Sequence, residues 1–237
     1  EMCIRDSVLE IGPGIGTITY EMAKKAKKVV AIEIDQSLIP ILDENLEEFD
    51  NVKLINEDIL KVDLKKLVEE EFNGESFKVV SNLPYYITTP IIEMLITRDL
   101  SCKDMTIMVQ KEVGERMVAS EKDKDYSSLS VFIKFYTEAK ILVKLPKSVF
   151  MPQPKIDSTI LKLKLRVYDE NVDQETLFKL VRAGFNKRRK TILNSMSDVI
   201  NKEDLKEAFE KTGLKENLRA ENLSIVDYIN LANQINQ

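Results

Sequence analysis

The sequence predicts an α/β fold in which helices cover both faces of a parallel sheet, followed by a small all-helical domain. Two observations support this. Short apolar runs alternate with segments of helical periodicity over the first 110 or so residues, a pattern typical of parallel strands joined by crossover helices. From Asp173 onward the pattern is helical and contains no strand signal. We therefore expect an α/β domain over residues 1–168 and a helical domain over residues 169–237.

The alternating part of the chain predicts five strands and five helices. The expected strands are Val8–Ile11, Val29–Ile34, Val52–Ile55, Phe77–Ser81 and Met105–Gln110. The expected helices are Thr17–Ala26, Leu38–Phe49, Leu64–Phe72, Pro90–Thr97 and one that ends near Met117. In such a sheet the ligand site lies beyond the carboxyl ends of the strands.

The following segment predicts a change of pattern. A helix is expected at Ser127–Tyr136, and two antiparallel edge strands at Lys140–Leu145 and Ile156–Val167. The loop between them, Pro146–Pro154, contains three prolines and should be stiff, because proline fits neither a helix interior nor a central strand. The last helices are expected near Thr176–Asn186, Lys190–Met196, Glu203–Thr212 and Ser224–Gln237.

Composition excludes several kinds of chemistry. The 237 residues include no histidine, which removes histidine-based triads and histidine-containing metal sites, and we expect no metal. Cys3 and Cys102 are expected to be free thiols in a reducing compartment, the cytoplasm. Apolar runs such as Lys28–Ile34 and Pro90–Ile96 are far shorter than the ~20 residues that a membrane span needs, so no membrane contact is expected. Glu1–Asp6 match no strand, cap or targeting signal, and we expect a truncated start there.

A glycine-rich loop follows the first strand. It reads Glu10-Ile-Gly-Pro-Gly-Ile-Gly-Thr17, with glycines at 12, 14 and 16, and glycine lets a backbone approach a ligand closely. The dinucleotide fingerprint requires a third glycine where Thr17 stands, so a nicotinamide oxidoreductase is the weakest alternative. The acidic-x-Gly-x-Gly-x-Gly order instead resembles the first motif of class I S-adenosylmethionine-dependent methyltransferases.

Two carboxylates at the next strand ends support a nucleoside ligand. Glu33 ends the second strand, where a carboxylate can accept hydrogen bonds from both ribose hydroxyls. Asp58 follows the third strand and can accept a hydrogen bond from an adenine amino group. The apolar neighbours Ile34 and Ile59 are counted with them as cofactor-binding residues.

The tetrapeptide Asn82-Leu83-Pro84-Tyr85 stands at the end of the fourth strand. The Asn82 side-chain carbonyl and the backbone carbonyl before Pro84 are acceptors, which can hold both N–H groups of an exocyclic amine. Such a site needs no strong base. The Tyr85 ring offers a face on which a base can stack, typically worth ~1–3 kcal/mol per base.

The tetrapeptide after such a glycine loop resembles that of the adenine N6 methyltransferases. The longer segment Asn82–Ile92 resembles the ribosomal RNA adenine dimethyltransferases, and within them the KsgA/RsmA type, which modifies small-subunit RNA. The segments Gln110–Arg116, Val149–Ser158 and Phe185–Thr191 are also similar to that family. The resemblance implies a class I (Rossmann-like) methyltransferase sheet, S-adenosylmethionine as cofactor, and dimethylation of two adjacent adenines in a hairpin loop near the 3′ end of small-subunit RNA.

The resemblance also implies roles for individual residues. Gly12 would lie at the methionine part of the cofactor, Glu33 at its ribose and Asp58 at its adenine; Asn82 would contact both cofactor and amine. Tyr85 and Phe150 would sandwich a base removed from its stack. The family's N-terminal extension, which also contacts the cofactor, is missing from this chain, so cofactor binding and turnover by the chain stay open. We expect a monomer that acts on small-subunit RNA or the assembling 30S particle.

A basic run suggests where RNA is contacted. Residues 171–237 contain 11 basic and 10 acidic side chains, against 24 and 30 in residues 1–170. The run Lys187-Arg188-Arg189-Lys190 is expected on the same helix as Arg182, as a contact for RNA phosphates or as a solvated face. Two alternatives remain: a non-catalytic ribosome-assembly factor with this fold, and a resistance-type dimethyltransferase acting on large-subunit RNA.

Overall fold

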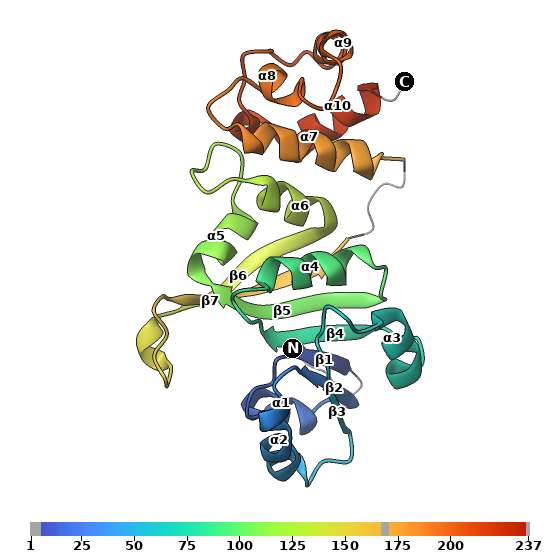
Figure 1. Ribbon diagram of the computed structural model, residues 1–237, viewed down its shortest axis with the longest axis vertical. Helices are drawn as coiled ribbons and strands as arrows, with labels where there is room; N and C mark the ends of the chain where they lie inside the picture. The colour runs from blue at the N-terminus through green and yellow to red at the C-terminus, as the bar shows by residue number, and fades with distance from the viewer. Residues whose placement is uncertain (1–5, 167–170, 236–237) are drawn as a thin grey trace. The chain divides into compact units, whose positions relative to one another are not determined.

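The structure, a computed structural model, describes residues 6–166 and 171–235 (Figure 1). The strands are β1 Ser7–Ile11, β2 Lys28–Glu33, β3 Val52–Asn56, β4 Phe77–Asn82, β5 Cys102–Gln110, β6 Thr137–Leu145 and β7 Ser158–Leu165. The helices are α1 Thr17–Ala23, α2 Ile39–Leu46, α3 Leu64–Phe72, α4 Thr88–Thr97, α5 Lys111–Val118, α6 Ser128–Tyr136, α7 Gln174–Asn186, α8 Ile192–Met196, α9 Lys202–Thr212 and α10 Ile225–Ile235.

The chain forms two compact units. The first contains Glu1–Gly114 and Lys140–Leu165, and the second contains Glu115–Ala139 and Arg166–Gln237. The second unit thus takes in the segment around α6 as well as the C-terminal helices. The domain boundary expected between residues 168 and 169 lies outside the described residues.

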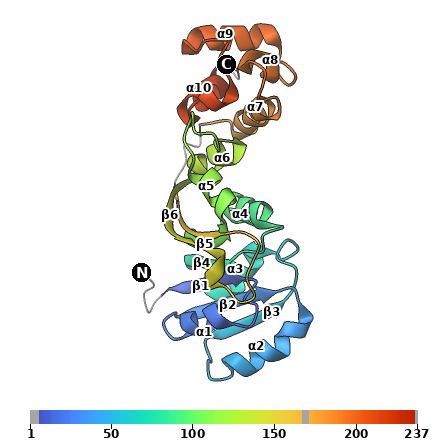
Figure 2. The same ribbon diagram turned by 90° about the vertical axis from the view of Figure 1, so that its left-hand side faces the viewer.

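The seven strands form one sheet in the order β3-β2-β1-β4-β5-β7-β6 (Figures 1 and 2). Adjacent strands from β3 to β5 pair in parallel, as the alternating pattern predicts. All five residues of β1 are buried and so are the last five of β2, which is the burial expected of central strands covered on both faces. Strand order and burial confirm the predicted α/β fold.

The prediction of two edge strands near the prolines was wrong for β7. That strand lies between β5 and β6 and pairs antiparallel with β5, from Gln110 opposite Ser158 to Asp104 opposite Lys164. Its alternation of buried and partly exposed residues is equally compatible with an edge or an interior strand, so pattern alone could not decide. The predicted end of this strand, Val167, lies outside the described residues.

The helical C-terminal segment has capped helices. The Asp173 carboxylate accepts hydrogen bonds from the backbone N–H groups of Glu175 and Thr176 at the start of α7, and Gly213 ends α9 in the left-handed region at φ +69°.

None of the helices in the described part of the chain is both long enough and apolar enough to cross a membrane. Cys102 is a buried free thiol, and burial raises its pKa to about 12; Cys3 lies outside the described residues.

Candidate active site

The glycine loop forms a tight connection between β1 and α1. All three of its glycines have positive φ: +70° at Gly12, +61° at Gly14 and +86° at Gly16. Such angles are strained for residues with a side chain. A Cβ at Gly12 would lie 3.5 Å from the Pro84 ring. The loop therefore runs directly beside the tetrapeptide that follows β4, and the missing side chain leaves the backbone of Gly12 open toward it.

Glu33 organises the loop from the end of β2. Its two carboxylate oxygens accept hydrogen bonds from the backbone N–H groups of Gly14, at 3.1 Å, and Asp35, at 3.0 Å. The side chain is buried, with 6% of the residue exposed. A carboxylate offers about four lone-pair sites, so both oxygens keep capacity for further donors after these two bonds.

Glu10 lies beneath the loop at the end of β1. It is 1% exposed, and its carboxylate accepts a 2.6 Å hydrogen bond from the Thr19 hydroxyl in α1. Burial, followed by the negative charge of Glu33, raises the pKa of Glu10 to about 7, although the bond from Thr19 acts in the opposite direction. Glu10 thus bridges the two elements that flank the glycine loop, and it does not line the cleft described next.

An open cleft lies over the carboxyl ends of β1 and β2. It brings together six of the predicted site residues from separate parts of the sequence. They are Gly12, Glu33, Ile34, Asp58, Ile59 and Pro84. The cleft is also lined by five residues that the sequence analysis did not single out: Ile11, Ile32, Glu57, Tyr86 and Ile87. Each of these five residues is adjacent to a predicted site residue or two positions from one. That closeness in the sequence is the signal by which they could have been predicted.

The tetrapeptide is fixed by its neighbours. Leu83 is buried and donates its backbone N–H to the Met108 carbonyl of β5, at 3.1 Å. The Ser81 hydroxyl, just before it, donates to the Ile11 carbonyl at 2.5 Å. The Pro84 carbonyl accepts from the Thr88 hydroxyl at 3.0 Å. Asn82, the last residue of β4, is exposed, so its side chain is accessible to a ligand.

The two aromatic side chains predicted to hold the base differ in how they are held. The Tyr85 hydroxyl is hydrogen-bonded to that of Ser158, at 2.8 Å, and the ring is half-buried. Phe150 is half-buried in the proline-rich loop, between Val149 and Met151, which are exposed. In the part of the chain that is described, Tyr85 and Phe150 do not form a ring contact with each other. The sandwich stays a prediction.

The basic run is not on a helix, which corrects the sequence expectation. Helix α7 ends at Asn186, and Lys187–Lys190 form a turn closed by the Lys190 N–H donating to the Lys187 carbonyl at 2.8 Å. Arg182 alone lies on α7. The helix that follows begins at Ile192 and not at Lys190.

Two members of the run have partners within the second unit. The Arg188 guanidinium donates to the Tyr126 carbonyl at 2.8 Å, and the Lys187 ammonium pairs with Asp198 at 2.5 Å. Tyr126 is itself fully buried, and its hydroxyl donates to the Leu223 carbonyl at 3.0 Å. Arg188 therefore has a structural role, whereas no ion pair is found for Arg189 or Lys190 within the described ranges.

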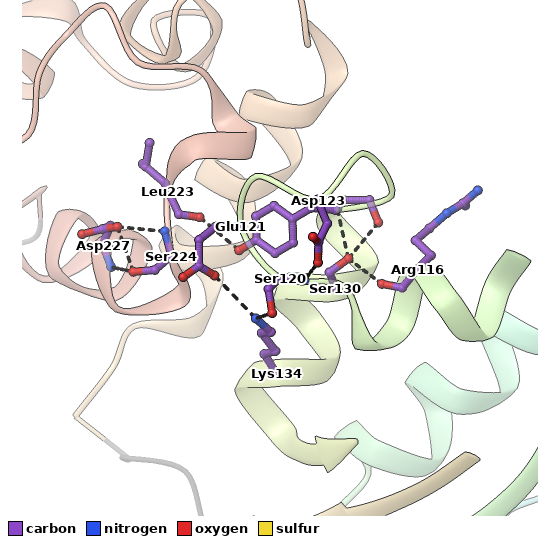
Figure 3. A network of polar contacts seen from close by, with 11 residues as sticks. Arg116, Ser120, Glu121, Asp123, Ser130, Lys134, Leu223, Ser224 and Asp227 are labelled. Atoms are coloured by element: carbon purple, nitrogen blue, oxygen red, sulfur yellow. Dashed lines mark hydrogen bonds and ion pairs between the residues drawn. The ribbon is translucent and has the colours of Figure 1, made fainter. Parts of the chain in front are cut away.

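A polar network holds the loop that receives Arg188. The Ser130 hydroxyl donates to the Arg116 carbonyl at 2.6 Å, and the Lys134 ammonium lies 3.2 Å from the Ser120 hydroxyl and 3.6 Å from Glu121 (Figure 3). In α7, a Cβ at Gly184 would lie 3.1 Å from the Ile192 side chain and 3.2 Å from that of Ala220, so these neighbours would have to move slightly. The side of α7 around Gly184 thus packs into the helical unit.

The glycine loop, Glu33 and the tetrapeptide around one cleft suggest a nucleoside-linked cofactor beside an amine-binding segment. The sequence model of the ribosomal RNA adenine dimethylase family matches residues 4–237. The chain belongs to the ribosomal RNA adenine dimethylase family.

Relatives within this family are similar over nearly the whole chain. Ribosomal RNA small subunit methyltransferase A of Clostridioides difficile is 46% identical over 236 residues, which cover 98% of this chain and 81% of that protein. The protein of the same name from Alkaliphilus oremlandii is 47% identical, over 97% of this chain and 82% of its own length.

Solved structures agree with this membership. A dimethyladenosine transferase from Plasmodium falciparum matches with a TM-score of 0.81 and 27% identity, over 97% of this chain and 90% of that one. The 23S rRNA methyltransferase ErmE matches with a TM-score of 0.74 and 25% identity, over 100% and 93% of the two chains. The dimethylase family thus accounts for the class I methyltransferase fold. Among the described residues, no group of three or more histidine, cysteine or acidic side chains could hold a metal ion.

Proposed function

We propose that this chain transfers methyl groups from S-adenosylmethionine to the N6 amines of two adjacent adenines in a hairpin loop near the 3′ end of small-subunit ribosomal RNA. One observation supports this most directly: the Pro84 ring of the tetrapeptide would lie 3.5 Å from a Cβ at Gly12 and lines the same cleft as Glu33 and Asp58. A cofactor bound by the cleft would thus lie beside the amine-binding residues. The relatives named for small-subunit RNA support the choice of substrate.

The cleft suits S-adenosylmethionine. Glu33 keeps lone pairs for the ribose hydroxyls, and one Asp58 oxygen accepts the Leu60 N–H at 3.0 Å, which leaves the other oxygen for an adenine amino group. Ile34 and Ile59 provide apolar surface for the flat base. The bound cofactor supplies a methyl group on a positively charged sulfur, which is already activated for transfer.

The protein's own contribution is to position the target amine. The Asn82 side-chain carbonyl and the Leu83 backbone carbonyl are the two acceptors proposed for its N–H groups. Holding both N–H groups directs the nitrogen lone pair away from them, which is the orientation that nucleophilic attack requires. After attack the amine nitrogen releases its proton to solvent. The chain has no histidine to accept this proton, and holding the amine by two carbonyl acceptors needs no strong base.

The base and the RNA backbone need further contacts. Tyr85 is proposed to stack on the target adenine, with Phe150 on its other face. Arg182, Arg189 and Lys190 are the proposed phosphate contacts, because Lys187 and Arg188 already have partners. The setting is ribosome biogenesis in the cytoplasm, with the chain acting as a monomer.

Two measurements test this proposal. Calorimetry should show binding of S-adenosylmethionine and no binding of NAD; NAD binding without a response to the methyl donor would contradict the cofactor assignment. Asn82→Ala should reduce the rate of methyl transfer much more than RNA affinity, because it removes a contact that counts in the transition state. An unchanged rate in this variant would show that another group holds the amine.

A further inference from the structure

Ser158 is the one buried side chain that holds the aromatic ring proposed to receive the base. It is 0% exposed, and its hydroxyl lies 2.8 Å from that of Tyr85, 73 residues earlier in the chain. Neither the tetrapeptide nor the cleft lining includes it. Within residues 6–166 and 171–235, the one side-chain hydrogen bond of Ser158 is to Tyr85, a residue of the proposed base pocket, and this points to a role in positioning.

The position of Ser158 is fixed by the sheet. It is the first residue of β7 and lies opposite Gln110 at the end of β5. The neighbouring Thr159 packs so closely on α5 that a Cβ at Gly114 would lie 2.1 Å from its methyl group. A hydroxyl attached to such a closely packed strand end has little freedom to move.

The same strand end also closes the proline-rich loop, Pro146–Pro154. Asp157, one residue before Ser158, accepts the Lys147 N–H with its carboxylate at 3.0 Å and the Lys111 N–H with its backbone carbonyl at 3.0 Å. The loop that contains Phe150 and the segment that contains Tyr85 thus meet at two consecutive residues. Ser158 bonds to Tyr85 through its hydroxyl, and Asp157 bonds to the backbone of Lys147 through its carboxylate.

A bond at the hydroxyl limits how the Tyr85 ring can move. The ring is attached to the backbone at one end and held by Ser158 at the other, so swinging the ring about χ1 breaks the hydrogen bond. A base that stacks on a ring already in place loses less free energy to ordering than one that stacks on a mobile ring. This explains the use of tyrosine here, because phenylalanine would offer the same face without the second attachment.

We propose that Ser158 is a positioning residue for methyl transfer: its hydrogen bond with Tyr85 fixes the ring on which the target adenine stacks and ties that ring to the base of the proline-rich loop. The inference rests on the proposed function. It assigns no chemical step to Ser158, which acts through Tyr85.

The test removes the hydrogen bond from each side. Ser158→Ala and Tyr85→Phe should each lower the single-turnover rate constant by roughly 2- to 12-fold, the factor that one net hydrogen bond of about 0.5–1.5 kcal/mol represents. The double variant should be no slower than the slower single variant, because both substitutions remove the same interaction. Thr159→Val is the control: it removes the neighbouring buried hydroxyl, which bonds to the Val143 carbonyl at 3.0 Å, and should leave the rate unchanged.

A second readout follows the base itself. An RNA hairpin with 2-aminopurine at the target adenine should change its fluorescence on binding the parent chain, and this change should be smaller for Ser158→Ala and for Tyr85→Phe at saturating protein. If Ser158→Ala does not fold, Tyr85→Phe still tests the bond from its half-buried side.

The outcomes separate this inference from the proposed function. Full activity and a full fluorescence change in Tyr85→Phe, with Tyr85→Ala inactive, would overturn the role of Ser158 and leave the proposed function standing. Additive losses in the double variant would also overturn it. A parent chain that binds the cofactor and the hairpin but transfers no methyl group would overturn the proposed function, and the inference with it.

Discussion

Substituting Glu10 by glutamine should make the chain more stable at neutral and alkaline pH and have no such effect in acid. Glu10 is 1% exposed beneath the glycine loop, and burial raises the pKa of its carboxyl group from 4.5 to about 7. Glutamine has a similar shape, still accepts a hydrogen bond from Thr19 and carries no charge at any pH.

The sign and size of the effect follow from proton linkage. Between pH 4.5 and about 7 the unfolded chain has released the Glu10 proton while the folded chain still holds it, so the free energy of unfolding falls as the pH rises through this window. At ~1.36 kcal/mol per unit of pKa difference, the loss amounts to about 3 kcal/mol above pH 7. The Glu10→Gln variant lacks this loss. Its stability relative to the parent should therefore rise by about 3 kcal/mol from acid to alkaline pH.

Urea unfolding of parent and variant at several pH values measures this difference directly. Glu47→Gln, which removes an exposed carboxylate from the end of α2, is the matched control and should follow the parent at every pH. A difference between Glu10→Gln and the parent that stays constant with pH would refute the reasoning, since it would show that Glu10 titrates alike in the folded and unfolded chain.

Three further predictions concern packing and charge. Gly114→Ala should lower the free energy of unfolding by ~1–3 kcal/mol in urea titrations, because the added Cβ overlaps the Thr159 methyl group, and an unchanged value would refute the packing. Arg188→Ala should destabilise the chain by about 1 kcal/mol through loss of its 2.8 Å bond to a backbone carbonyl, whereas Arg189→Ala should leave the melting temperature unchanged; equal effects would contradict this assignment. Arg189→Ala with Lys190→Ala should reduce the slope of log RNA affinity against log salt concentration by about one to two units. Identical slopes and affinities in variant and parent would place the RNA contact elsewhere.

Much of the first unit could be predicted because its signals are local. The alternation of strands and helices predicts parallel strands at Val8–Ile11 and Val29–Ile34, and the glycine spacing identifies the loop between the first strand and helix. The position of β7 could not be predicted in the same way. Strand order depends on which edge a returning strand joins, and the alternating pattern of Ser158–Leu165 is the same for either position.

The candidate site likewise contains residues that the sequence pattern predicts and contacts that it does not. Gly12, Glu33 and Asp58 line the predicted cleft because each lies at or just beyond the carboxyl end of a parallel strand, and such strand ends meet at one edge of the sheet. The contact between Tyr85 and Ser158 joins residues 73 positions apart through two hydroxyl groups, and no periodicity marks it. The structural role of Arg188 was likewise hidden, because a basic run gives the same sequence signal whether its side chains face solvent or a backbone carbonyl.

The most direct test of the proposed function is to incubate small-subunit particles that lack the modification with methyl-labelled S-adenosylmethionine and this chain, and to map the labelled nucleotides. We expect label at N6 of two adjacent adenines in a hairpin loop near the 3′ end of the small-subunit RNA, and its loss in Asn82→Ala. Particles that bind the chain but acquire no label would contradict the account and favour a non-catalytic assembly factor. In a parallel incubation with large-subunit particles, label in large-subunit RNA alone would contradict the assigned substrate.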